Sequence, residues 1–191
     1  MSRIVRVLAV AVLLAPACAS APATDGSIAA GVTPPVLPTS ALPRMTSDAT
    51  SVDADHLANE VTHPDELRTL LDDAGLVRAA QRSFGGGRGA FSRVVARGLV
   101  FETEEGAAAF VSWFGDHASQ QIITSERISP SGIPDGVIVF RHLPDGCCHN
   151  DVPVFLAAWQ RGESVLTLHA GGRRANVRAF VDVIAAYDRE A

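Results

Sequence analysis

The sequence predicts an α+β fold in which an antiparallel sheet of about four strands carries helices on one face. Three observations support this prediction. Amphipathic segments with helix caps alternate with short apolar segments along the chain. The last three apolar segments follow one another through links that favour antiparallel neighbours. A final amphipathic segment completes the order helix, strand, helix, three strands, helix (α-β-α-β-β-β-α).

The first predicted helix lies in THPDELRTLLDDAG, residues 62–75. Thr62 is the expected N-cap, Pro64 suits the first turn, and Gly75 suits the position after the last turn. The apolar residues recur on one face at helical spacing: Leu67, Leu70, Leu71 and Ala74. The segment therefore predicts an amphipathic helix of about three turns.

The first predicted strand lies in AFSRVVARGLVFE, residues 90–102. Its apolar residues change parity between Ala96 and Leu99. If helices cover only one face of the sheet, one extra residue is needed to return the apolar side chains to that face. We therefore expect a β-bulge at Arg97 and Gly98.

The second predicted helix lies in TEEGAAAFVSWFGDHA, residues 103–118, with Thr103 as its N-cap. Its apolar face carries three aromatic residues: Phe110, Trp113 and Phe114. Aromatic side chains at helical spacing are typical of a buried core, and we interpret them in this way rather than as a ligand-binding cluster. His117 follows at the C-terminal end, where an imidazolium interacts favourably with the helix dipole.

The last third of the chain contains three predicted strands and a closing helix. The strands lie in GIPDGVIVFRHL, VPVFLAAWQ and ESVLTLHAG, and the short Arg-Gly link between the last two predicts a hairpin. The helix is expected over residues 173–188. His169 falls in the last strand on the same face as Val165 and Thr167, so we interpret it as a partly buried histidine bonded to backbone or hydroxyl.

Residues 1–17 have the pattern of a bacterial export signal. Arg3 and Arg6 precede an apolar run, residues 7–15, that is too short to span a bilayer. The run leads into LAPAC, in which small residues before Cys18 are typical of a lipobox and predict a palmitate-type anchor on the thiol. The alternative is ordinary signal cleavage at an A-x-A site around Cys18, which leaves no lipid.

Residues 18–55 are rich in Ala, Pro, Ser and Thr without a sustained period, which predicts a flexible tether. We expect a single folded domain over residues 56–191. Without Arg3 and Arg6 the chain has fourteen basic residues against 21 acidic ones, a formal charge of −7. Such an acidic chain is a poor nucleic-acid binder. We therefore expect no nucleic-acid partner and contact with the cell membrane through the N-terminal lipid alone.

The stretch LPDGCCHND, residues 143–151, contains two adjacent cysteines, Cys147 and Cys148. Oxidising surroundings outside the cytoplasm favour a disulfide between them, although neighbouring α-carbons lie closer together than the usual disulfide span. Thiolates with imidazoles also suit Zn or Cu(I), so a metal site of His142, Cys147, Cys148 and His149 is the alternative. The sequence leaves open whether this loop is structural, redox-active or metal-binding.

Several segments together resemble a group of actinobacterial (mycobacterial-type) envelope lipoproteins. These segments are LLDDAGLVRAAQRSF, EEGAAAFVSWF, GIPDG and VFLAAWQRGESVLTLHAGG, followed by an Ala-rich final helix. The resemblance implies a lipid-anchored α+β domain on the extracytoplasmic face of the cell membrane, of the kind used for sensing or ligand binding. The group defines no catalytic residues, so none are assigned here.

The sequence contains neither a G-x-S-x-G nor an H-E-x-x-H motif. We therefore expect a non-catalytic binding or sensing module without a cofactor. Its partner is expected to be an apolar or envelope-derived ligand, or another protein. The alternative is a metal-binding or redox-responsive envelope protein that uses the loop containing Cys147 and Cys148.

Overall fold

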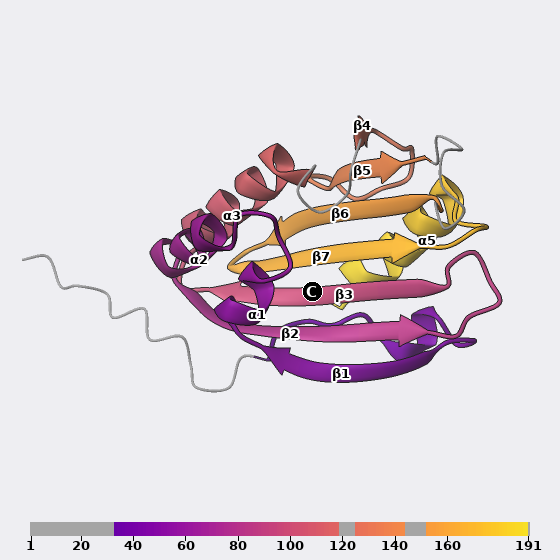
Figure 1. Cartoon of the computed structure of the whole chain (residues 1–191), viewed down its shortest axis with the longest axis horizontal. Helices are drawn as coiled ribbons and strands as arrows, with labels where there is room; N and C mark the ends of the chain where they lie inside the picture. The colour runs from indigo at the N-terminus through magenta and orange to yellow at the C-terminus, as the bar shows by residue number, and fades with distance from the viewer. Residues whose placement is uncertain (1–32, 119–124, 144–151, 191) are drawn as a thin grey trace, which may run out of the picture.

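The computed structural model describes residues 33–118, 125–143 and 152–190. These residues form one antiparallel, seven-stranded sheet in the order β1-β2-β3-β7-β6-β5-β4. The strands are β1 Thr46–Val52, β2 Leu76–Gly85, β3 Arg93–Phe101, β4 Glu126–Ile128, β5 Ile138–His142, β6 Val154–Arg161 and β7 Ser164–Gly171. Figure 1 shows β3 and β7 side by side in the middle of this sheet.

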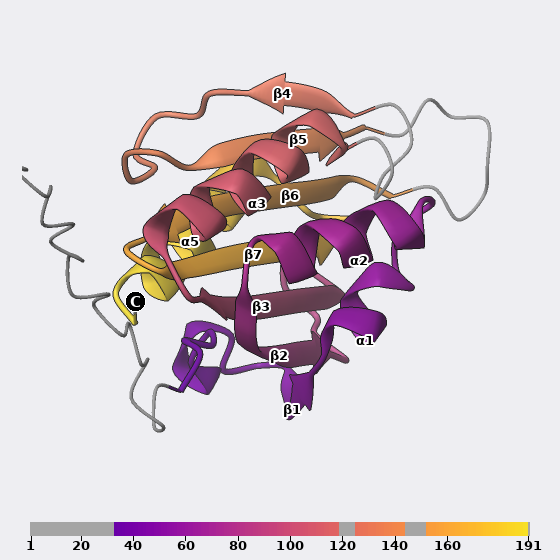
Figure 2. The same ribbon diagram turned by 90° about the vertical axis from the view of Figure 1, so that its left-hand side faces the viewer.

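Helices cover both faces of the sheet. The helices are the short 3-10 helix η1 Thr39–Ala41 and the α-helices α1 Ala54–Ala58, α2 Pro64–Asp73, α3 Glu104–Asp116 and α5 Val177–Asp188. Figure 2 shows α1, α2 and α3 in front of the sheet and α5 behind it. Within the described residues, no helix has the length and apolar character needed to cross a membrane.

The predicted sheet of about four strands with helices on one face was wrong, as was the order α-β-α-β-β-β-α. The four expected strands are present as β3, β5, β6 and β7, but β1, β2 and β4 join them. β1 has the sequence TSDATSV and is exposed along almost its whole length, so it lacks the apolar alternation that indicates a strand. β4 has only three residues, which is too few for any period to be visible.

β3 is buried on both faces, and this explains the parity change in its sequence. Val94 and Ala96 belong to the cluster under α5, whereas Leu99 and Phe101 belong to the cluster under α1, α2 and α3. The pairing of β3 with β2 and β7 runs without interruption through Arg97 and Gly98. The expected β-bulge at this position was therefore wrong, because a central strand with two covered faces needs none.

Part of the segment that the sequence assigned to a tether packs into the domain. Leu37 is fully buried in the cluster under α5, and the hydroxyl of Tyr187 donates a hydrogen bond of 2.9 Å to the carbonyl oxygen of Pro35. A β-carbon at Gly98 would lie 1.9 Å from the same carbonyl oxygen, so this close approach requires a glycine. The folded part therefore begins before His56.

The capping predictions were confirmed for the second helix and only partly for the first. The Thr103 hydroxyl accepts a hydrogen bond of 3.0 Å from the amide of Gly106, as an N-cap does. The N-cap of α2 is His63 rather than Thr62, and its side chain makes no capping bond. Gly75 follows α2 with φ of 70°, a left-handed conformation that favours glycine.

Candidate ligand-binding site

A cavity of about 340 Å³ lies between the sheet and the helices α1, α2 and α3. Its floor comes from β3 and β7: Arg93, Val95, Arg97, Leu99, Thr167 and His169. Its walls come from α1, α2 and the turn between them (Leu57, Glu60, Val61 and Leu67) and from α3 (Phe110, Trp113 and Phe114). We call this cavity the β3–β7 pocket.

The register of the two central strands gathers polar side chains on the floor. Thr167 of β7 lies directly opposite Arg97 of β3, and His169 lies opposite Val95. Because side chains alternate between the faces of a strand, these residues share one face with Leu99 and Val165. Leu99 and Val165 lie beneath α1, α2 and α3 in the apolar core. The same sheet face is therefore apolar at one end and polar in the pocket.

Arg97 is held in place by two side chains. Its Nε donates a hydrogen bond of 2.6 Å to Oε1 of Gln81, and its Nη2 is bonded to Oε2 of Glu60. Burial lowers the pKa of Arg97 from its usual value, although the ion pair with Glu60 opposes this change. The guanidinium stays charged, since its ordinary pKa is far above neutral. Arg97 thus fixes one positive charge in the floor.

His169 is a neutral imidazole in this setting. Burial lowers its pKa to about 4, and the positive charges of Arg97 and Arg93 act in the same direction. At neutral pH the ring therefore presents one nitrogen as a donor and the other as an acceptor. The pocket thus contains a polar group that adds no charge.

The hydroxyl of Thr167 has no hydrogen-bond partner among the described residues, although Thr167 is only 7% exposed. The described residues also supply no partner for the ring of His169, which is half-buried in the pocket, or for the guanidinium of Arg93, which lines the pocket but is exposed. Leaving a buried polar group unpaired costs about 1–3 kcal/mol, and native proteins rarely do so. The floor of the pocket therefore contains hydrogen-bonding groups that the described residues do not pair.

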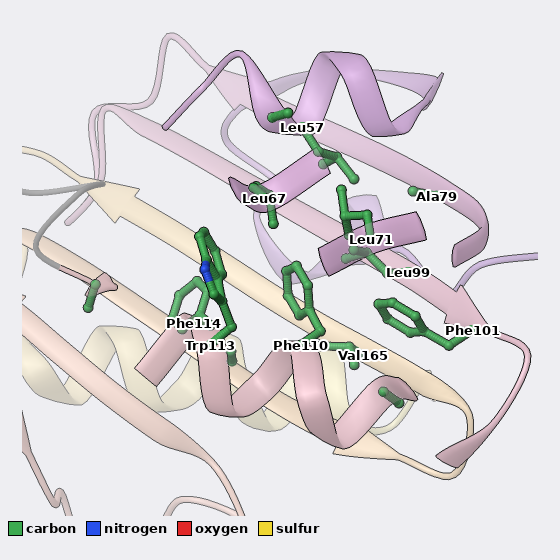
Figure 3. Close-up of a cluster of buried hydrophobic side chains, with 14 of the residues drawn as sticks. Leu57, Leu67, Leu71, Ala79, Leu99, Phe101, Phe110, Trp113, Phe114 and Val165 are labelled. Atoms are coloured by element: carbon green, nitrogen blue, oxygen red, sulfur yellow. The ribbon is translucent and has the colours of Figure 1, made fainter. Parts of the chain in front are cut away.

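The aromatic wall is fixed to α2 through one carboxylate. Oε1 of Glu66 accepts a hydrogen bond of 3.2 Å from Nε1 of Trp113 and lies 3.0 Å from Nε2 of His117. The rings of Trp113 and His117 are stacked with centroids 4.8 Å apart. Figure 3 shows Phe110, Trp113 and Phe114 facing the leucines of α1 and α2. Glu66 thus connects the two helices that form opposite sides of the pocket.

Comparison with solved structures finds a similar fold in a mycobacterial protein. The crystal structure of the extracellular domain of PknH from Mycobacterium tuberculosis is similar with a TM-score of 0.50, over 79% of this chain and 88% of that chain. The sequences are 13% identical over this match, so the similarity shows the fold alone. No protein-family model and no curated protein sequence matches the chain.

Most of the site residues expected from the sequence lie outside the described residues. These are Cys18, Cys147, Cys148 and His149. His142 is the last residue of β5 and pairs with Val154 of β6. The disulfide between the two adjacent cysteines and its metal-binding alternative both stay predictions, which intact mass and alkylation without reductant can test.

Several pocket residues have roles that differ from those predicted from the sequence. The aromatic residues of α3 are indeed core residues, and they also form the pocket wall. The expected hydrogen bond of His169 to backbone or hydroxyl is absent from the described part of the chain. A usable signal was that Arg97 and Thr167 lie between apolar residues in the middle of two largely buried strands, which indicates a polar function on a buried face.

Proposed function

We propose that the domain is a non-catalytic binding module whose ligand occupies the β3–β7 pocket. The observation that carries this proposal is the buried Thr167 hydroxyl, for which the described residues supply no partner, beside the neutral ring of His169. A ligand with polar atoms at this position satisfies these groups. The cavity of about 340 Å³ lies within the range of about 300–1,000 Å³ that is usual for small-molecule sites.

We also propose that the module lies outside the cytoplasm and is held at the cell membrane by a lipid on Cys18. The export-signal pattern and the lipobox-like LAPAC support this location. The PknH domain with a similar fold is extracellular, which agrees with the same side of the membrane. Fractionation of cells that express Cys18→Ser tests the anchor, because the variant is expected to leave the membrane fraction. Retention of the variant there would contradict the anchor and leave the pocket proposal untouched.

The pocket proposal is tested by filling the cavity. Val61 lines the pocket and is half-buried, so Val61→Trp places an indole in the ligand space. Val77 is 39% exposed and does not line this pocket, so Val77→Trp is the matched control. We expect native mass spectrometry of the protein from an actinobacterial host to show a small molecule bound to the unaltered protein and to Val77→Trp. The molecule should be absent from Val61→Trp.

Equal occupancy of the two tryptophan variants would refute the pocket as the binding site. Circular dichroism of both variants shows whether the added indole has disturbed the fold. Binding to a chain that keeps its strand and helix content but has a filled pocket would place the ligand elsewhere.

A further inference from the structure

We infer that the β3–β7 pocket takes a small organic acid with one negative charge and an apolar body. This inference rests on the proposed function and adds the chemical class of the ligand. It follows from three properties of the pocket, which are its charge balance, its unused hydrogen-bonding groups and its aromatic wall.

The charge balance of the lining favours a single negative charge. Among the described residues of the lining, Arg93 and Arg97 are the two cations and Glu60 is the one acid. Since His169 is neutral, one positive charge remains in excess. Glu60 is already bonded to Arg97, whereas Arg93 is exposed and has no ion-pair partner among the described residues. A monoanion with its charged group at Arg93 neutralises this excess, while a cation would meet two arginines.

The unused hydrogen-bonding groups suit an oxyanion. The Thr167 hydroxyl can donate to a carboxylate oxygen, and so can the protonated nitrogen of His169. Arg97 has five N–H donors by its chemistry, and the contacts with Gln81 and Glu60 leave donors over. A carboxylate is an acceptor with several lone pairs, so it can satisfy these groups together.

The remaining lining suits an apolar body of limited size. Phe110, Trp113 and Phe114 form one wall, and Leu57, Val61 and Leu67 form the other. A cavity of about 340 Å³ lies near the lower end of the usual range for ligand pockets. The ligand is therefore a short-chain or single-ring acid rather than a complete membrane lipid.

The experiment compares three probes that share an eight-carbon chain and differ in their head group. Octanoate, octanol and octylammonium are titrated into the protein at pH 7.5 by isothermal calorimetry. We expect octanoate to bind at least about tenfold more tightly than the other two, since charged groups that pair in a partly buried site contribute this much or more. Arg93→Gln should lower octanoate affinity to about that of octanol. Arg178→Gln removes an exposed arginine from α5 on the opposite face, and we expect it to leave the affinity unchanged.

Two outcomes overturn the inference. One is equal binding of the three probes with no effect of Arg93→Gln, and the other is no measurable binding of octanoate at millimolar concentration. In either case the proposed function still stands if Val61→Trp loses the molecule that the unaltered protein carries. If Val61→Trp keeps that molecule, the pocket itself is refuted, so the two failures can be told apart.

Discussion

Thr167 places a hydroxyl on a buried face of the sheet, where an unpaired polar group costs stability. Its hydroxyl is buried beside Arg97 and His169, and the described residues offer it no hydrogen bond. Valine has almost the same shape without the hydroxyl. Residues that bind ligands often keep such a cost, because function rather than stability selects them.

We predict that Thr167→Val raises the free energy of unfolding of the ligand-free protein by roughly 1 kcal/mol, because it removes an unpaired buried hydroxyl. The same substitution should weaken binding in the pocket. Urea denaturation and calorimetric titration with octanoate measure the two effects. A purely structural threonine would instead give a less stable variant, which is the result that would contradict a ligand role.

His169 predicts a specific pH dependence of stability. Its pKa is about 4 in the folded protein, against about 6.5 for an ordinary histidine. Below pH 6.5 the unfolded chain therefore takes up a proton that the folded protein does not accept. The free energy of unfolding therefore falls as the pH drops from about 6.5 to about 4, and His169 causes no further change below that. The total loss due to His169 has an upper limit of about 3 kcal/mol.

We predict that His169→Gln removes this pH-dependent part of the free energy of unfolding. Denaturation curves at pH 7 and pH 4 should differ less for the variant than for the unaltered protein, since glutamine does not titrate. An unchanged difference between the two pH values would show that the imidazole at position 169 is not buried in the neutral form.

At the scale of elements, a side-chain contact links α2 and α3, which both line the pocket. Glu66 accepts from Trp113 and contacts His117, so one side chain connects the two helices. We predict that Glu66→Ala lowers the free energy of unfolding by about 1 kcal/mol, as loss of one or two partly exposed hydrogen bonds does. Glu66→Gln can still accept from Trp113 and should cost less. Urea denaturation compares the two variants, and equal stabilities would contradict a role for this bond.

How much of the fold could be predicted from the sequence depended on how apolar each element is. The helix at residues 104–116 has an apolar face and an N-cap, and β6 and β7 are largely apolar runs joined by a tight turn, so all three were predicted correctly. β1 is a polar strand whose only strand neighbour among the described residues is β2, and β2 carries Arg78, Gln81 and Arg82 among its apolar residues. Tertiary pairing rather than local pattern makes such segments strands.

The site was only partly predictable for a related reason. The sequence shows which residues share a face of one strand, but not which strand lies beside it. Only the pairing of β3 with β7 brings Arg97 opposite Thr167. The long link between these strands in the sequence, which contains α3 and three other strands, gives no local signal for that register.

At the scale of the whole molecule, residues 33–55 before His56 pack into the folded domain. They contribute β1, the fully buried Leu37 and the carbonyl bonded to Tyr187. We predict that a chain starting at Thr33 melts like the full protein. A chain starting at His56 should be less stable by several kcal/mol, since burial of one leucine alone contributes about 2 kcal/mol. Differential scanning calorimetry tests this prediction. Equal melting temperatures of the two chains would show that the segment before His56 does not contribute to the stability of the domain.

The strand order also has a kinetic consequence. The strands β1, β2 and β3 pair with their neighbours in sequence, and so do β4, β5, β6 and β7. Among the described strands, the two groups pair only where β3 lies beside β7. That pairing closes the longest loop, so we expect it to form late in folding. The floor of the pocket spans the same junction, with Arg97 on one group and Thr167 on the other. A bound ligand would therefore hold the two halves together, slowing their separation during unfolding while leaving the rate of refolding almost unchanged.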